Sequence, residues 1–290
     1  MKSLLDRHLP KIVVAPSFAA VLFFVYGFIG WTLYVSFTKS RILPKYDLVG
    51  WLQYDKLFAT PRWYVALDNL FVFTGLFVAI AILIGLLLAI LLDQKIRAEG
   101  VIRTIYLYPM ALSFIVTGTA WKWLLNPGLG IEKVVQDLGF PDFKFDWLVD
   151  PEMAIYTVVM AGVWQSSGFV MALFLAGLRS INEEIVRAAQ VDGVGPFRLY
   201  FHIIIPSLRP VFVSAVIVLS HLAIKSFDLV IALTHGGPGY STDMPATFMY
   251  AMAFSRGQLG QAAASATVML ATVSAVIIPY LYSELRRKHD

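Results

Sequence analysis

Long apolar stretches constrain what this chain can fold into. Six of them are long enough to cross a bilayer, since a spanning helix needs about 20 mostly apolar residues. They cover residues 12–37, 66–92, 105–125, 153–178, 211–233 and 259–282. Only 14% of the residues are charged, too few to cover a water-facing surface, and a soluble domain has about 25%. Unpaired backbone groups are costly in lipid, so each span must be helical. The sequence predicts an all-α integral membrane protein with six transmembrane helices.

The lysines and arginines predict how these spans are oriented. Six spans place both termini on one side of the membrane, and basic residues favour the cytoplasmic side. With cytoplasmic termini, thirteen basic residues lie inside and nine outside, and Lys225 lies within a span. We therefore predict a cytoplasmic segment 1–10, one transmembrane domain 11–284 and a cytoplasmic tail 285–290. The loop at about 179–206 then faces the cytoplasm.

Several function classes lack the residues that they need. The chain has no cysteine, which excludes disulfides and thiol catalysis. Its five histidines show no H-x-x-x-H spacing, which argues against a zinc site, and no G-x-x-x-x-G-K-[ST] loop is present for ATP. We therefore assign no catalytic residue, no metal and no cofactor to this chain. The net charge of +4 fits the charge bias of membrane proteins, and we expect no nucleic-acid partner.

A polar, Gly- and Pro-rich segment, RAAQVDGVGPFRLYFHIIIPSLRP, interrupts the apolar sequence at 187–210. The preceding residues predict a short helix that Asn182 caps and Gly193 ends, with acids in its first turn. A second helical piece should follow and end before Pro206. The segment is either an ordinary solvated loop or a docking surface for a cytoplasmic protein. Small side chains would let a partner approach its backbone, and these are Ala188, Ala189, Val191 and Gly193.

This segment resembles the permease signature of bacterial ABC importers, which reads E-A-A, then D-G-A, then I-x-L-P-x-L-x-P. The matching residues are Ala188, Ala189, Asp192, Gly193, Ile203, Pro206, Leu208 and Pro210. Two further stretches resemble sugar permeases of the maltose-transporter type. FDLVIALTHGGPGYST at 227–242 is similar to the loop after their fifth core helix, and LYPMALSFIVTGTAWKWLLNPGLG at 107–130 to their third. The glutamate of the signature falls on Arg187, and Glu183 and Glu184 lie one turn earlier.

The resemblance implies a type I ABC importer permease fold in the bacterial inner membrane, with a cytoplasmic coupling helix. It implies a second permease subunit, two ATPase subunits that carry ATP and Mg, and an extracytoplasmic sugar-binding protein as partners, besides sugar and membrane lipid. The glucose/mannose-type and α-glucoside permeases look most similar. The implied ATPase-coupling residues are Glu184, Arg187, Ala188, Ala189, Asp192 and Gly193.

Polar residues inside the fourth span are candidates for the substrate pathway, because they are costly in lipid. In VWQSSGF at 163–169, amide and hydroxyl groups could bond sugar hydroxyls and an aromatic ring could stack on the sugar. Packing between helices, with a structural glutamine, is the alternative. Alignment on the motifs places some of these residues, with one serine each from the third and fifth spans, where the maltose-type subunit lines its site. The predicted pathway residues are Ser113, Trp164, Gln165, Ser166, Phe169, Lys225 and Ser226.

Charged residues inside the fifth span allow three interpretations. A charge near the centre of a span costs about 2.5–3.5 kcal/mol, and Lys225 and Asp228 are three residues apart. On a continuous helix they would share a face and pair, with His221 one turn earlier. They could form a structural ion pair, place Lys225 at the sugar path, or relay protons in an ion-coupled secondary transporter. An ABC permease for a non-sugar solute is a further alternative.

Overall fold

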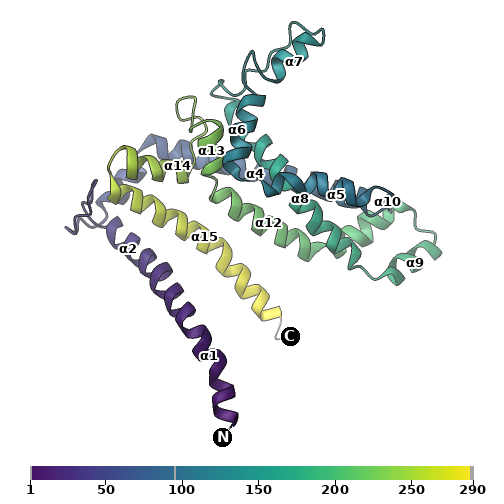
Figure 1. Cartoon of the computed structure of the whole chain (residues 1–290), viewed down its shortest axis with the longest axis horizontal. Helices are drawn as coiled ribbons and strands as arrows, with labels where there is room; N and C mark the ends of the chain where they lie inside the picture. The colour runs from purple at the N-terminus through teal and green to yellow at the C-terminus, as the bar shows by residue number, and fades with distance from the viewer. Residues whose placement is uncertain (1, 95, 288–290) are drawn as a thin grey trace. The chain divides into compact units, whose positions relative to one another are not determined.

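The computed structural model describes residues 2–94 and 96–287 (Figure 1). Over these residues the chain forms helices, joined by turns, and one isolated antiparallel bridge between Thr38 and Leu48. The predicted all-helical fold is confirmed. Met1 and residues 288–290 of the predicted terminal segments lie outside the described residues, as does Lys95.

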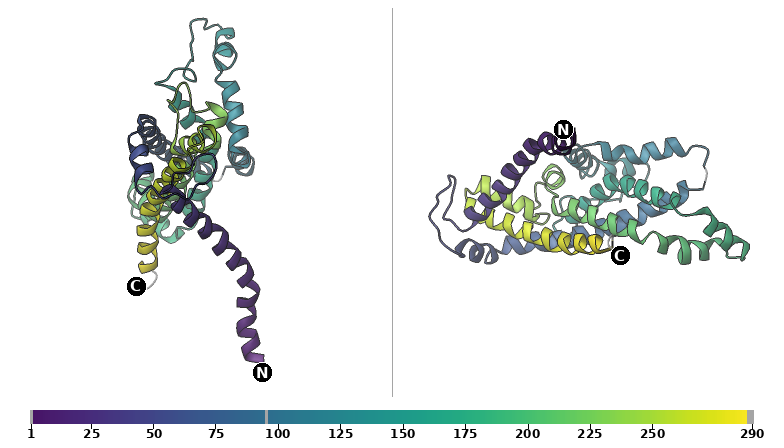
Figure 2. Two further views of the ribbon diagram at one scale, coloured as in Figure 1. Left: turned by 90° about the vertical axis from the view of Figure 1, so that its left-hand side faces the viewer. Right: turned by 90° about the horizontal axis from the view of Figure 1, so that it is seen from below.

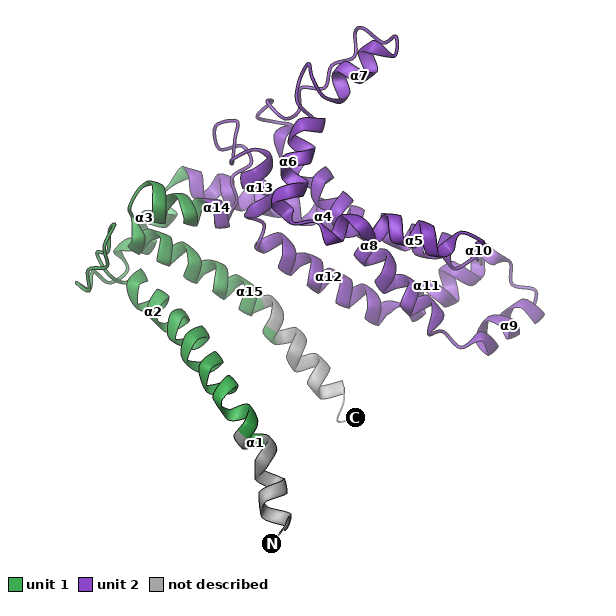
Figure 3. Cartoon of the chain, in the orientation of Figure 1, with its two compact units in different colours: residues 1–61, 248–290 green, residues 62–247 purple. Residues whose placement is uncertain are grey.

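The chain divides into two compact units, which Figure 3 colours separately. Unit 1 comprises residues 1–61 and 248–290. In it, helix α15 packs against α2 and α3, so residues from the two ends of the chain build one body. Its elements are α1 (Lys2–Val21), η1 (Leu22–Tyr26), α2 (Gly27–Ser36), α3 (Leu52–Phe58), η4 (Ala251–Ser255) and α15 (Leu259–Arg287). Helix α14 (Pro245–Tyr250) crosses the boundary between the units.

Unit 2 comprises residues 62–247, and α8 forms its core. In the apolar part of α8, 72% of the residues are buried, against 28% in that of the long helix α4. The hairpin that holds α9 and α10 stands at one end of this unit (Figure 2, right). The other elements are α4 (Pro61–Leu92), α5 (Glu99–Leu107), η2 (Tyr108–Ala111), α6 (Phe114–Leu124), α7 (Ile131–Asp137), α8 (Ala154–Arg179), α9 (Glu183–Val191), α10 (Pro196–Leu199), η3 (Tyr200–Ile204), α11 (Ile205–Ser207), α12 (Arg209–Ile224) and α13 (Asp228–Leu233).

Three described helices are long and apolar enough to span a membrane: Val13–Ser36, Pro61–Leu92 and Ala154–Arg179. The count becomes five if each of two bent helix pairs is one span, so the exact number of six is not confirmed. The apolar part of α15 that qualifies, Leu259–Ala275, is shorter.

Two predicted spans are not continuous helices. The span predicted at 105–125 is bent by 101° between the segment Glu99–Ala111 and α6. Pro109 lies in the 3-10 turn η2 at this bend, and Ser113 caps the new helix that follows. The span predicted at 211–233 ends as α12 at Ile224 and resumes as α13. Hydropathy records the apolar length of these segments but not the breaks within them.

Candidate functional site

The predicted coupling helix is present as α9, with a polar cap at each end. The Asn182 side-chain oxygen accepts a hydrogen bond from the backbone N–H of Glu184 at 2.9 Å. At the other end, the N–H of Val194 bonds to the carbonyl of Ala189, and the N–H of Gly193 bonds to the carbonyl of Gln190. These two bonds form a Schellman motif, which needs a left-handed residue, and Gly193 has φ +75°. The predicted start and end of this helix are confirmed.

The two alanines of the signature differ in their exposure, since Ala188 is exposed and Ala189 is buried. Ala189 is buried in the hydrophobic core of unit 2 and anchors the helix there. The prediction that both alanines are open to a partner is therefore wrong for Ala189. The other five predicted coupling residues are exposed, namely Glu184, Arg187, Ala188, Asp192 and Gly193. Val191 at 87% exposure and Phe197 at 74% add apolar surface beside them.

The helical piece after α9 does not end where the sequence predicts. Helix α11 continues through Pro206 to Ser207. Pro206 lies in α11, which follows the π-helical turn η3 without a gap, and the helix ends at the next residue. Prolines and π-turns are common causes of bends in helices. The chain bends by 63° between Pro196–Ser207 and α12.

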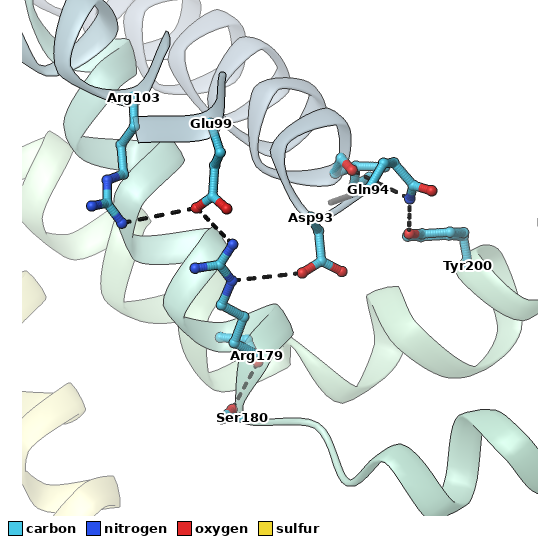
Figure 4. A network of polar contacts seen from close by, with 9 residues as sticks. Asp93, Gln94, Glu99, Arg103, Arg179, Ser180 and Tyr200 are labelled. Carbon is cyan, nitrogen blue, oxygen red and sulfur yellow. Dashed lines mark hydrogen bonds and ion pairs between the residues drawn. The ribbon is translucent and has the colours of Figure 1, made fainter. Parts of the chain in front are cut away.

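A polar network fastens the loop at 179–206 where it leaves and re-enters the helical body (Figure 4). Arg179, the last residue of α8, lies 2.7 Å from Glu99 of α5 and 3.8 Å from Asp93, just after α4. Gln94 donates a hydrogen bond of 2.8 Å to the Tyr200 hydroxyl at the far end of the loop. These side chains are partly exposed, so each contact contributes little energy. Together they fix the position from which α9 projects.

The break between α12 and α13 borders a cavity of about 170 Å³. Lys225, Ser226 and Asp228 of the break line it. The stacked rings of Phe73 and Phe77, whose centroids are 5.2 Å apart, lie on the same cavity. A cavity with hydroxyl and charged groups beside aromatic faces has the chemistry of a small polar-ligand site.

Lys225 and Asp228 do not share a helix face, so the predicted arrangement is wrong. Lys225 caps the C-terminal end of α12, and Asp228 begins α13. Among the described residues no ion pair joins them. A cation at a helix C-terminus and an anion at a helix N-terminus are each favoured by the helix dipole. The two charges thus stabilise the ends of two helices at the break.

The other predicted pathway residues lie elsewhere. Ser113 caps α6, its hydroxyl accepting from the N–H of Val116 at 3.3 Å. Trp164 borders a separate, mainly apolar cavity of about 650 Å³, with its ring edge-on to Trp121. Ser166 is buried, and Phe169 packs against the hydrophobic core. Of the seven predicted residues, the structure brings only Lys225 and Ser226 to the cavity at the helix break.

Gln165 has a structural contact of its own. Its side-chain amide donates a 2.7 Å hydrogen bond to the carbonyl of Leu112, the residue between η2 and α6. The glutamine is 5% exposed, and its side-chain oxygen has no partner in the structure. The amide nitrogen therefore satisfies a backbone group at the 101° bend, while the oxygen remains an open acceptor.

We expect Gln165→Leu to lower the stability of the chain, because it leaves the part-buried Leu112 carbonyl without its hydrogen bond. Such a loss costs about 1–3 kcal/mol. The measurement is the apparent unfolding temperature in mild detergent, with Ser166→Ala as the matched control at the neighbouring buried position. An unchanged unfolding temperature in Gln165→Leu, together with loss of solute-stimulated activity, would instead support a substrate contact.

One buried ion pair was not predicted from the sequence. Arg62, at the start of α4, lies 2.6 Å from Asp243, whose side chain is 1% exposed. Asp243 also accepts a hydrogen bond from the Thr247 hydroxyl, and its backbone carbonyl accepts from Asn69. The Arg62 guanidinium lies 4.1 Å from the centre of the Tyr240 ring. The pair ties the loop after α13 to α4, but its two residues are 181 positions apart, beyond the reach of any spacing rule.

Fold and site together define a helical membrane subunit with a rigid projecting helix and an internal polar cavity. The chain belongs to the family described as "Binding-protein-dependent transport system inner membrane component", whose model matches residues 81–287. It is thus a transport subunit of the ABC importer class rather than an enzyme.

Relatives cover almost the whole chain. It is 41% identical to the "Probable ABC transporter permease protein PH1215" of Pyrococcus horikoshii, over 94% of this chain and 95% of that protein. It is 39% identical to the "Xylose/arabinose import permease protein XacH" of Haloferax volcanii, over 91% and 84%. A chain in the crystal structure of a bacterial ABC transporter that imports alginate matches with a TM-score of 0.83 and 21% identity, covering 98% and 97% of the two chains. This last match shows the fold alone.

Proposed function

We propose that this chain forms part of the translocation pathway of a sugar importer and couples it to a cytoplasmic ATPase. The observation that carries the coupling is α9, a short helix that is capped at both ends and has five of the six predicted coupling residues exposed on it or directly after it. A rigid element can transmit movement between two arrangements of a complex, whereas a flexible loop would absorb it. In this proposal both termini and the loop at 179–206 are cytoplasmic.

Arg187 stands where the signature has its glutamate, and its contact explains how the change is tolerated. Its guanidinium pairs with Glu183 at 2.6 Å, and both side chains are more than 70% exposed. Such an exposed pair on a helix contributes only about 0.3–0.5 kcal/mol. Arg187 can therefore exchange Glu183 for an acidic group of an ATPase at little cost.

Sugar is the proposed substrate class. The cavity at the helix break offers hydroxyl and charged groups beside the Phe73 and Phe77 rings, a combination suited to a polyhydroxylated ring. Similar permeases are named for xylose and arabinose in Haloferax volcanii and for glucose in Saccharolobus solfataricus. Within this class we favour a glucose/mannose-type or α-glucoside substrate. The proposed partners are a second permease subunit, two ATPase subunits that hold ATP and Mg, and an extracytoplasmic binding protein.

Co-purification tests the proposal. The tagged chain is extracted in mild detergent, the proteins bound to it are identified, and ATP hydrolysis is measured with the cognate binding protein and a panel of solutes. The panel includes sn-glycerol 3-phosphate, because a 30% identical permease of Pectobacterium atrosepticum is named for it. Stimulation by one sugar supports the proposal. A chain that purifies alone and takes up solute into vesicles when a proton gradient is applied would contradict the proposal.

The end of α9 gives a sharper test of coupling. Gly193 has φ +75° and nothing within 4 Å of a built Cβ, so within this chain a substitution there acts through backbone strain. Gly193→Val should cost at least about 1–2 kcal/mol at this left-handed position and lower coupled uptake roughly 5- to 30-fold. Gly193→Asn is the matched control, since asparagine tolerates this conformation. Both variants should reach the membrane, and equal uptake by the two would count against a rigid coupling helix.

A further inference from the structure

A basic pocket in unit 1 has no role in the function proposed above. It has a volume of about 920 Å³ and lies between the segment after α2, helix α3 and the turn before α15. No aspartate or glutamate is among its lining residues. Five cationic side chains line it, and these are Lys39, Arg41, Lys45, Lys56 and Arg256.

The floor of this pocket is rigid. Gln53 is 6% exposed and donates a 2.7 Å hydrogen bond to the carbonyl of Thr38. Gln261, also 6% exposed, donates to the Thr60 hydroxyl at 3.1 Å. Gly260 packs so closely that a Cβ there would lie 2.7 Å from the Thr38 carbonyl oxygen. Both amides that line the pocket are therefore held in place, Gln53 by a carbonyl outside the pocket and Gln261 by a hydroxyl on the pocket wall.

The cationic segment is also fixed, although it lies on the surface. The Ser40 hydroxyl accepts from the backbone N–H of Lys45 at 3.1 Å and donates to the carbonyl of the same residue at 2.8 Å. This closes the segment into a short loop that carries Lys39, Arg41 and Lys45. In the described part of the chain, none of these three, nor Lys56, has a carboxylate within ion-pairing distance. Gathering like charges in one pocket creates a strong positive potential that an anion would relieve.

The position of the pocket relative to the apolar helices indicates which anion it binds. The apolar helix Val13–Ser36 ends three residues before Lys39, and α15 begins three residues after Arg256. Aromatic side chains of the kind found at membrane surfaces lie on the same segment of the chain as the pocket residues. Trp51 is 66% exposed, and its ring lies 5.2 Å from that of Tyr54. If Val13–Ser36 spans the bilayer, the pocket at its end lies at the level of the lipid headgroups.

Membrane insertion does not account for these charges. Basic residues favour the cytoplasmic side, but in the proposed topology this pocket lies on the opposite side. We propose that the pocket binds the phosphate of an anionic phospholipid headgroup, with the five cations around the phosphate and the Gln53 and Gln261 side chains beneath it. Basic pockets beside transmembrane helices bind anionic headgroups on the cytoplasmic side of membranes, and the proposal extends this chemistry to the opposite side.

Lipid binding to the purified importer complex tests this assignment. The complex is exchanged into detergent without added lipid and titrated with phosphatidylglycerol or phosphatidylcholine. The bound lipid molecules are counted by native mass spectrometry. The variant K39Q/R41Q/K45Q removes three charges from the pocket. The matched control K122Q/K133Q/K144Q removes three basic charges that the proposed topology puts on the same side but outside the pocket. We expect the pocket variant to bind phosphatidylglycerol at least tenfold more weakly, and the control to bind it as the wild type does.

Further measurements distinguish a lipid from the other possible ligands of the pocket. Displacement of phosphatidylglycerol by millimolar inorganic phosphate would indicate a soluble-anion site and overturn the lipid assignment. Unchanged lipid binding in the pocket variant, with loss of stimulation by the binding protein, would overturn it in favour of a protein contact. If the triple variant does not fold, the exposed single substitution Arg41→Gln replaces it, with Arg41→Lys as the charge-preserving control. Equal lipid binding by those two variants would overturn the proposal as well.

Discussion

Replacing Asp243 with alanine should destabilise unit 2 by about 3–5 kcal/mol, the usual cost of removing one partner of a buried ion pair. Asp243 is almost fully buried, and its carboxylate meets both Arg62 and Thr247. Without it, the Arg62 charge, which is only 15% exposed, loses its carboxylate. The measurement is the apparent unfolding temperature in mild detergent, together with the yield of monodisperse protein.

Asp137→Ala provides the matched control for this prediction. Asp137 also pairs with a basic residue, Lys133, at 2.7 Å, but its side chain is 63% exposed. An exposed pair contributes about 0–1 kcal/mol, so this variant should behave as the wild type does. A second variant, R62L/D243L, removes both charges at once, and replacing a whole buried pair by apolar residues is often neutral. Equal unfolding temperatures for Asp243→Ala and Asp137→Ala would refute a stabilising role for the buried pair.

The Arg62–Asp243 ion pair also helps to hold the loop after α13 in one conformation. The hydroxyls of Thr234 and Thr242 lie 2.7 Å apart, and Thr242 also bonds to the carbonyl of Gly237. Asp243 follows directly and fastens this closed loop to α4 through Arg62 and Asn69. The sequence motif at 227–242 thus forms a structured surface, because its anchor lies one residue beyond it.

Helix α9 could be predicted because its signals are local. Asn182 and Gly193 are within two residues of the ends that they define, and each acts through backbone groups close in sequence. The caps of a helix depend little on the rest of the fold. The direction in which Ala189 points could not be predicted in the same way. It depends on the hydrophobic core of unit 2, to which residues distant in the chain contribute.

The breaks within the apolar segments were missed for a related reason. A hydropathy window averages over about 19 residues, so a gap of three residues at 225–227 leaves no mark on it. The spacing of Lys225 and Asp228 implies a shared face only if the helix continues between them. The bend before α6 is supported by Gln165, which lies 53 residues from the carbonyl that it satisfies. Such tertiary contacts decide where a helix stops, and no local pattern records them.

Gly168→Ala should be strongly destabilising, because Gly168 also makes a contact between helices that are distant in sequence. A Cβ at Gly168 of α8 would lie 1.8 Å from the carbonyl oxygen of Tyr106 in α5 and 2.7 Å from its carbon. Both are backbone atoms, so no side-chain movement can relieve the clash and the two helices must separate. Overpacking costs about 1–3 kcal/mol where side chains can adjust, and here the loss should reach or exceed the top of that range.

Gly75→Ala is the control for Gly168→Ala, because it makes the same chemical change in a helix without the clash. Gly75 lies in α4 and has nothing within 4 Å of a built Cβ. Alanine is favoured over glycine within a helix by about 0.8–1.0 kcal/mol, so this variant should be as stable as the wild type or more so. Only Gly168→Ala should therefore lower the apparent unfolding temperature. A similar shift in both would mean that α5 and α8 are not in backbone contact at Gly168. Only side-chain contacts, such as the hydrogen bond from Gln165 to Leu112, would then hold α8 against the bend before α6.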